Sequence, residues 1–237
     1  MRRFFIENIT FPVCKLTGNE NKHLSEVLRA KSGDRIILCN GDGKDYIYEI
    51  VDFSRSETSL KFIESEDNKS EPRLDLTVYF ALLKGDKSEL VVQKLTELGV
   101  KHIVPFISKY CVSRPDKTDR LVRSAVEACK QCGRAVVPTI SDIKQVGSIV
   151  KDFDQFDKVV FAYEKISKSQ STLSELLSGK ESKVALVIGP EGGFSDEEYE
   201  MIISSGVKPV SLGNRILRAE TASIAAAAVI FSMEGDW

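Results

Sequence analysis

The chain has 237 residues, of which 42% are hydrophobic and 29% are charged, the balance of a globular protein with one large or two modest domains. Its formal net charge of -2 excludes a globally basic nucleic-acid-binding protein, so any basic surface must be local. The longest nearly apolar run, 222–233, is too short to span a bilayer, the N-terminus lacks the apolar stretch of a signal peptide, and five cysteines without an extracellular cue favour reduced thiols in the cytoplasm.

Residues 1–70 are predicted to form a small β-rich domain, a partly closed barrel. The glycines in 40–43 indicate a hairpin turn between two alternating apolar runs. The polar stretch 64–72, which ends in a proline, is predicted to be a linker. The elements expected here are a short helix over 20–28 and strands over 35–39, 45–53 and 60–63.

From residue 73 onward strands and helices alternate, which predicts a parallel sheet covered by helices on both faces. Gly99 and Gly133 mark the ends of two of the helices, and Ser195 with Glu198 forms a capping box at the start of a third, which Gly206 ends. The strands are expected over 74–83, 102–107, 158–163, 184–188 and 209–212, and the other helices over 87–98, 119–132 and 220–233. In helix 87–98 the side chains expected to face the core are Leu90, Val91, Leu95 and Leu98.

Two glycine-bearing turns, 189–193 and 212–218, each follow a short apolar run and precede a helix. Either turn could be a plain connection between a strand and a helix. The first has more glycines than one turn needs, a rigidifying Pro190 and an acidic Glu191 between them. Neither a Walker A motif nor G-x-G-x-x-G occurs. Because ligands bind at the carboxyl ends of the strands in open α/β sheets, we expect the two turns to build one pocket.

The last helix is rich in alanine, which favours close packing in the core and lets other chain segments cross nearby. Arg218 precedes this helix, and Glu220 lies in its first turn. A helix N-terminus favours an anionic group nearby. Arg218 is therefore either a charge at the rim or a residue that faces a substrate.

Positive charge is concentrated in 101–134, which contains eight Lys or Arg residues and three acidic residues. The region is either a solvated helix face or a surface for RNA phosphates. A second basic surface on the small domain would include Arg2, Arg3, Lys22 and Arg29.

Cys129 and Cys132 form the sequence's single C-x-x-C, and we interpret them as core thiols on one face of a helix. A zinc site would need a second pair of ligands, and His23 and His102 are the only histidines. No metal is expected.

The motif LVIGPEGGFS at 186–195, followed by LGNRILRAET at 212–221, resembles the closing signature of the bacterial small-subunit rRNA uridine-N3 methyltransferases, of the trefoil-knotted SPOUT superfamily. Three further stretches resemble the same family: HLSEVLR at 23–29, KGDK at 84–87 with QKLTELGV at 93–100, and QCGR at 131–134. The resemblance thus covers nearly the whole chain. Ala135 and Val136 stand where polar or basic residues are common, which weakens an RNA role for that loop, and Ala219 stands where threonine is common.

The resemblance implies a PUA-like RNA-binding barrel over 1–70, a knotted methyltransferase domain over 73–237, a homodimer, and S-adenosylmethionine as methyl donor for N3 of a uridine in small-subunit rRNA. It implies that the cofactor lies among three strand-end turns, at Ala162, Tyr163, Ile188, Gly189, Pro190, Glu191, Gly192, Leu212, Gly213, Ile216, Leu217 and Arg218. In our hypothesis Arg218 offsets charge on the uracil, and Glu191 or Glu220 is the base that removes the N3 proton. The residues expected to bind the RNA, or the small subunit itself, are Arg2, Arg3, Lys22, Arg29, Lys84, Arg114, Arg123 and Arg134.

Two alternatives remain open. The same fold could methylate another RNA position, such as a ribose 2′-hydroxyl, although the N-terminal domain and the ILRAET ending argue against this. A non-catalytic RNA-binding assembly factor would be expected to lose the glycines or Arg218, and both are retained.

Overall fold

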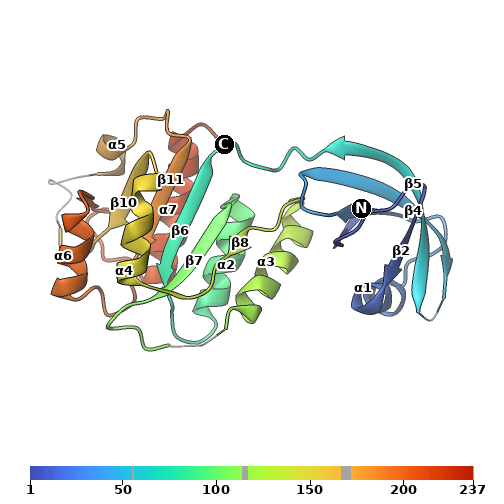
Figure 1. Ribbon diagram of the computed structural model, residues 1–237, viewed down its shortest axis with the longest axis horizontal. Coiled ribbons are helices and arrows are strands. Elements are labelled where there is room, and N and C mark those ends of the chain that lie inside the picture. Colours follow the sequence, from blue (N-terminus) through green and yellow to red (C-terminus); the bar gives the residue numbers. More distant parts are fainter. Residues whose placement is uncertain (55, 114–116, 167–171, 237) are drawn as a thin grey trace. The chain divides into compact units, whose positions relative to one another are not determined.

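The computed structural model describes residues 1–54, 56–113, 117–166 and 172–236 (Figure 1). The chain divides into two compact units. The first comprises Met1–Glu71 together with Cys129–Val137, and the second comprises Pro72–Ala128 together with Pro138–Trp237. The first unit therefore includes a segment that the sequence-based boundaries assigned to the second domain.

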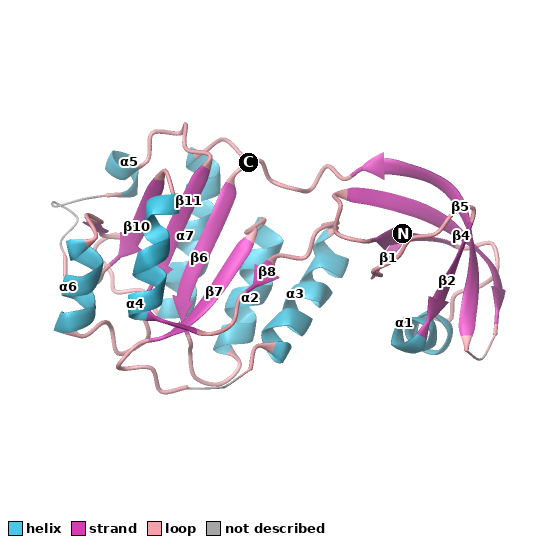
Figure 2. Cartoon of the chain, in the orientation of Figure 1, coloured by secondary structure: helices cyan, strands magenta, loops and turns pink. Residues whose placement is uncertain are grey.

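The first unit is built on a five-stranded sheet in the order β1-β3-β4-β5-β2. Figure 2 shows its strands in magenta. β1 runs parallel to β3, and the other neighbours are antiparallel. Its core holds apolar side chains such as Leu16, Leu38 and Ile50, all buried. The elements are β1 (Arg2–Phe5), β2 (Val13–Thr17), α1 (Gly18–Lys22), the π-helical turn η1 (His23–Val27), β3 (Arg35–Cys39), β4 (Lys44–Phe53) and β5 (Glu57–Asp67).

Two features of this unit correct the sequence analysis. β1 and β2 were not expected as strands. The predicted linker at 64–72 is wrong in its first part, because β5 continues to Asp67, which pairs with Lys44 of β4. The end of β5 is exposed, so its polar composition reflects solvent contact and not the absence of a strand.

The second unit contains a parallel sheet in the order β12-β10-β11-β6-β7-β8, with β9 also paired to β7. Its strands are β6 (Asp75–Ala81), β7 (His102–Ile107), β8 (Thr139–Ile140), β9 (Lys144–Gln145), β10 (Lys158–Ala162), β11 (Lys183–Ile188) and β12 (Pro209–Val210). The helices are α2 (Lys87–Leu98), α3 (Asp119–Cys132), whose last turn belongs to the first unit, α4 (Val146–Ile149), the 3₁₀ helix η2 (Val150–Gln155), α5 (Leu173–Leu176), α6 (Asp196–Ser204) and α7 (Ala219–Met233).

Helices cover both faces of this sheet, as predicted (Figure 1). Alternate strand residues, among them Tyr79 and Phe161, pack with Ile149 of α4 and Ile202 of α6. On the other face α7 contacts α2, β6 and β11. α7 buries a stripe of small residues, including Ala226 and Ala227, which confirms the interpretation of a closely packed helix.

Most element boundaries in this unit agree with the sequence analysis. α2 ends at Gly99, whose φ of 104° is a left-handed cap, and the capping box of Ser195 and Glu198 is present. The inward orientation expected for Leu90 is wrong, since this side chain is exposed. The short elements β8, β9, α4, η2 and α5 were not anticipated. Among the described residues, none of the helices combines the length and apolar character needed to cross a membrane.

Candidate active site

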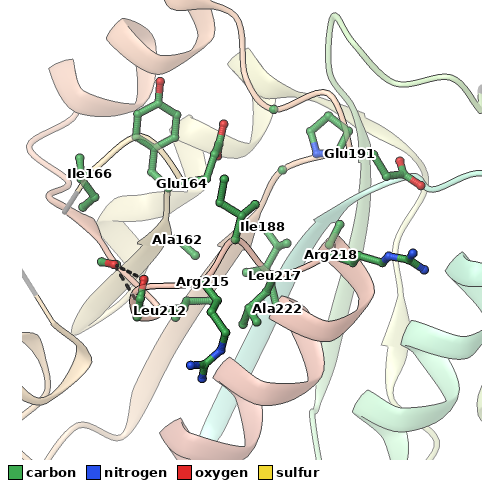
Figure 3. A pocket seen from close by; sticks show the side chains of 18 of the residues that line it. Ala162, Glu164, Ile166, Ile188, Glu191, Leu212, Arg215, Leu217, Arg218 and Ala222 are labelled. Atoms are coloured by element: carbon green, nitrogen blue, oxygen red, sulfur yellow. Dashed lines mark hydrogen bonds between the residues drawn. The ribbon is translucent and has the colours of Figure 1, made fainter. Parts of the chain in front are cut away.

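A cavity of about 710 Å³ lies at the carboxyl ends of three neighbouring strands, β10, β11 and β12 (Figure 3). β10 is the central strand, and Ala162 at its end pairs with Ile188 on one side and Val210 on the other. The segments that follow the three strands therefore meet at one edge of the sheet. The residues that line the cavity are Ala162–Glu164, Ile166, Ile188–Gly193, Ser211–Ala219 and Ala222. Every residue predicted to bind the cofactor is among them.

The turn after β11 is shaped by close contacts that only glycine allows. An added Cβ at Gly189 would lie 2.6 Å from the Phe194 ring, which is buried in the core. Gly193 has a φ of 72°, and its N–H donates to the Pro190 carbonyl at 2.9 Å. The turn then enters α6 through the Ser195 cap. The backbone at 189–193 is thus held in one conformation, with its polar groups next to the cavity.

The segment after β12 forms the opposite wall. Ser211 fixes its start, because the Ser211 hydroxyl accepts a hydrogen bond from Gly213 N–H at 3.2 Å. Ile216 is 82% exposed although it lines the cavity. Arg218 is exposed and is the N-cap residue of α7, and the small Ala222 on the first turns of that helix leaves room for the cavity.

Two of the candidate catalytic residues, Glu191 and Glu220, are joined at one edge of the cavity by a lysine that was not predicted. Lys87 Nζ lies 3.3 Å from Glu191 Oε1 and 3.4 Å from Glu220 Oε1. Glu191 lines the cavity, whereas Glu220 does not. The Glu220 side chain is only 12% exposed, and its Oε2 is buried with no hydrogen-bond partner among the described residues. Figure 3 shows Arg218 and Glu191 extending toward the same side of the cavity.

Sequence reasoning missed several other residues of this site. Glu164 and Ile166 line the cavity because the chain continues along it past the end of β10, and Arg215 lines it within the 212–218 segment. Lys87 belongs to the KGDK stretch that carried part of the family resemblance. That motif was the available signal, but nothing in it indicated a contact with Glu191, which lies 104 positions later.

The residues predicted to bind RNA fall into three groups. Arg2, Lys22 and Arg29 are exposed on the first unit, and Lys84 and Arg123 are exposed on the second. Arg114 lies outside the described residues. Arg3 and Arg134 are buried. Within 101–134, Lys117, Arg120 and Arg123 keep an exposed positive surface at the start of α3.

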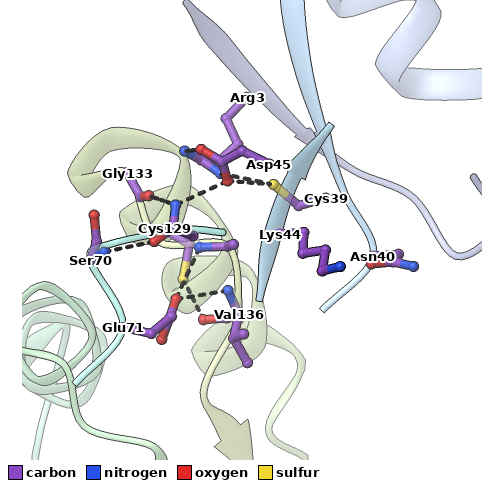
Figure 4. Close-up of polar contacts among 12 residues, drawn as sticks. Arg3, Cys39, Asn40, Lys44, Asp45, Ser70, Glu71, Cys129, Gly133 and Val136 are labelled. Carbon is purple, nitrogen blue, oxygen red and sulfur yellow. Dashed lines mark hydrogen bonds and ion pairs between the residues drawn. The ribbon is translucent and has the colours of Figure 1, made fainter. Parts of the chain in front are cut away.

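Arg3 and Arg134 correct the sequence analysis, because both form ion pairs inside the first unit. Figure 4 shows Arg3 beside Asp45. Arg3 forms a two-pronged pair with Asp45, with Nη2 at 2.7 Å from Oδ2. Arg134 pairs with Glu71 at 3.0 Å, and the other oxygen of Glu71 accepts hydrogen bonds from the backbone N–H of Ala135 and Val136, each 2.9 Å long.

Asn68 completes this polar cluster. Its amide donates to Asp45 at 2.9 Å and to the Gly133 carbonyl at 3.0 Å. A charged group that is buried away from water needs a partner of opposite charge. The guanidinium groups of Arg3 and Arg134 therefore pair with carboxylates of the protein and are not directed at RNA phosphates.

The two cysteines of the C-x-x-C motif differ in environment. Burial raises the pKa of Cys129 to about 12, which describes an inert core thiol, and Cys132 is half-buried. In the described part of the chain, no group of three or more His, Cys, Asp or Glu residues is arranged to hold a metal ion.

Two models of known protein families match this chain. A model described as "RNA methyltransferase domain" matches residues 69–231, and one described as "RNA methyltransferase PUA domain" matches residues 16–63. Together they define a class of protein, an RNA methyltransferase with an N-terminal PUA domain.

Similar proteins narrow the class. Ribosomal RNA small subunit methyltransferase E of Bacillus subtilis is 34% identical over 97% of this chain and 96% of its own length. A methyltransferase structure from Legionella pneumophila with bound S-adenosylmethionine has a TM-score of 0.89 at 30% identity, covering 97% of this chain and 96% of that one. A ribosomal RNA small subunit methyltransferase E from Neisseria gonorrhoeae, bound to S-adenosylmethionine, has a TM-score of 0.88 at 26% identity, covering 98% of both chains. The chain belongs to the ribosomal RNA small subunit methyltransferase E family.

Proposed function

We propose that this protein transfers a methyl group from S-adenosylmethionine to small-subunit ribosomal RNA. The observation that carries the proposal is that the ends of β10, β11 and β12 share one cavity. It unites all the predicted cofactor-binding residues in a chain whose family relatives are named for this activity and in two cases are crystallised with this molecule.

The residues that line the cavity fit S-adenosylmethionine. The volume is in the range of small-molecule sites, and apolar walls from Ile188, Leu212 and Leu217 suit an adenosyl group. Backbone N–H and C=O groups of the two turns offer hydrogen bonds to its polar edges. Glu164 and Glu191 supply negative charge for a molecule that carries an ammonium and a sulfonium.

When bound, S-adenosylmethionine supplies a methyl group already activated on sulfur, so this chain's residues need only position the acceptor, manage its proton and stabilise developing charge. We infer from the family resemblance that the acceptor is N3 of a uridine. N3 carries a proton and lies on the base-pairing edge, so the uridine must be unpaired or flipped out.

The geometry favours separate roles for the three candidate catalytic residues. Glu191 lines the cavity and is the better placed base for the N3 proton. Glu220 does not line it and acts through Lys87, the cation that it shares with Glu191. Arg218 lines the cavity and is exposed, which suits a guanidinium that offsets charge on the uracil oxygens.

The remaining parts of the proposal rest on the resemblance. The exposed basic residues of the two units hold the RNA, either as free rRNA or within the small subunit, in the cytoplasm. The protein acts as a homodimer, and the exposed Ile216 at the cavity offers apolar surface that a second copy can cover. The trefoil knot of the second unit remains a prediction.

The test is Arg218→Ala. We expect methyl transfer to small-subunit rRNA to fall by at least 10²-fold, while calorimetric titration shows S-adenosylmethionine binding largely retained. Unchanged turnover would remove Arg218 from the mechanism. Mass spectrometry of rRNA nucleosides from cells with and without the gene identifies the methylated position, and a methylated ribose would overturn the N3 assignment.

A further inference from the structure

The segment that follows β7 is anchored to the start of α6. The Ser108 hydroxyl donates to Glu198 Oε2 at 3.1 Å, and Lys109 N–H donates to Glu198 Oε1 at 2.8 Å. Cys111 is buried, and its N–H donates to the Ser108 carbonyl at 3.1 Å. The backbone on both sides of Tyr110 is therefore fixed.

The Tyr110 side chain itself is 47% exposed, although its base packs tightly on the cavity-lining turn. An added Cβ at Gly192 would lie 2.8 Å from Tyr110 Cβ. Gly192 lines the cavity and has no side chain. Tyr110, which follows β7, can therefore approach the rim of the cavity. A rigid backbone and a partly exposed ring together make a preformed flat surface.

The charges around Tyr110 distinguish between possible occupants of this surface. Lys109 Nζ lies 6.0 Å from the centroid of the Tyr110 ring and 3.3 Å from Glu197 Oε2. The turn on which Tyr110 packs carries Glu191, which is paired with Lys87 of α2. The cores of protein–protein interfaces are depleted of charged residues, so the charged groups around Tyr110 do not suit a protein partner. They suit a nucleotide, whose base stacks on the ring while its phosphate attracts nearby lysines.

We propose that Tyr110 is a stacking platform for an unpaired nucleobase of the RNA substrate, at the rim of the cavity. This inference rests on the proposed function and adds a residue that positions the RNA strand. Stacking on Tyr110 holds the RNA strand in its unpaired form beside the methyl donor. It is tolerant of base identity, because every base has a π-face.

Three substitutions test this role. Tyr110→Ala is expected to raise the KM for RNA roughly 5- to 100-fold, the range of base–aromatic stacking, with unchanged S-adenosylmethionine affinity by calorimetry. Tyr110→Phe keeps the ring and should retain near-normal KM. Val112→Ala is the matched control, because Val112 is 71% exposed in the same segment and has no ring. An equal rise in the KM for RNA in Tyr110→Ala and Val112→Ala would overturn the stacking role. A rise in the KM of Tyr110→Phe as large as that of Tyr110→Ala would overturn it as well.

A spectroscopic experiment reports stacking without catalysis. Tyr110→Trp is introduced together with Trp237→Phe, which removes the sequence's single tryptophan. Titration with a short oligouridylate should quench the emission of the new indole, and no quenching at RNA concentrations that saturate binding would overturn the proposal. If Tyr110→Ala instead changes the oligomeric state in sedimentation, the surface belongs to a protein interface.

The outcomes separate this inference from the proposed function. Failure of the unmodified protein to bind S-adenosylmethionine or methylate rRNA would contradict the proposed function. The fluorescence titration still decides whether Tyr110 stacks on RNA.

Discussion

Two clusters of ion pairs, one in each unit, combine basic side chains with carboxylates in opposite ways. In the first unit Arg3 and Asp45 are 7% and 9% exposed and are paired through two contacts, with Asn68 donating to the same carboxylate. In the second unit Lys87 is 35% exposed and divides its charge between Glu191 and Glu220 at 3.3 and 3.4 Å. One Glu220 oxygen there is buried without a partner among the described residues.

The difference separates a cluster whose charges are paired inside the unit from a cluster beside the cavity for which we propose a catalytic role. In the buried cluster the carboxylate and guanidinium hydrogen bonds are directed within the unit, so it stabilises the fold. The cluster at the cavity has longer contacts, a partly exposed Lys87 and Glu191, and an unsatisfied Glu220 oxygen, which is the arrangement that the proposed catalytic role requires. Exposure and hydrogen-bond satisfaction distinguish the two clusters, whereas charge alone does not.

The largest expected effect comes from breaking the buried cluster. Asp45→Asn removes the charge that compensates Arg3 and should lower the free energy of unfolding by about 3 kcal/mol, because an uncompensated buried charge remains. Urea unfolding of the full chain measures this. Methyl transfer per folded molecule should not change.

Glu57→Gln is the matched control for that variant. The Lys15–Glu57 pair lies in the same unit, but its side chains are 60% and 33% exposed. Its loss should cost less than about 1 kcal/mol. Equal destabilisation by the two variants would contradict the role assigned to the buried pair.

The next effect comes from the cluster at the cavity. Lys87→Met leaves two neighbouring carboxylates without their shared cation, and we expect methyl transfer to fall about 100-fold through misplacement of Glu191. Stability should change by less than about 1 kcal/mol, since the pair is partly exposed. Lys87→Arg should restore most of the activity by keeping the charge. A variant that loses stability and activity in parallel would instead make this cluster structural.

The smallest effect is the pH dependence of the buried cluster. Burial by itself would raise the pKa of Asp45, but hydrogen bonds from Arg3 and Asn68 outweigh it and hold the pKa below its ordinary value. A lowered pKa in the folded state contributes stability above the unfolded pKa of about 3.9, and this contribution is lost as the pH falls through the folded pKa.

The stability difference between the unmodified protein and Asp45→Asn should therefore be constant from about pH 5 to 7 and shrink below about pH 4. Unfolding titrations at several pH values measure it. A difference that persists undiminished at the acid end would show that Asp45 acts through packing and not through its charge.

The sequence predicts what depends on local pattern and fails where long-range packing decides. α2 and α3 have the predicted boundaries because glycines with positive φ follow both. The cavity was predictable because strand ends in a parallel sheet meet at one edge. β1 and β2 were missed because they are short and flank a segment without alternation.

Charged residues show the same limit. Nothing in the local sequence distinguishes Arg3, which is buried, from Arg2, which is exposed. The carboxylates that decide their roles are brought close only by the fold: Asp45 lies 42 positions after Arg3, and Glu191 lies 104 positions after Lys87. Contacts over such separations leave no periodic signal in the chain.

The first unit includes nine residues, Cys129–Val137, from the middle of the chain. The polypeptide consequently passes between the units three times, after residues 71, 128 and 137. Residues 1–71 therefore do not contain the whole first unit. If they were grafted onto another catalytic domain, Glu71 would lose its ion pair with Arg134 and the two hydrogen bonds that it accepts from backbone N–H groups. An exchange of the first unit among relatives must therefore include Cys129–Val137.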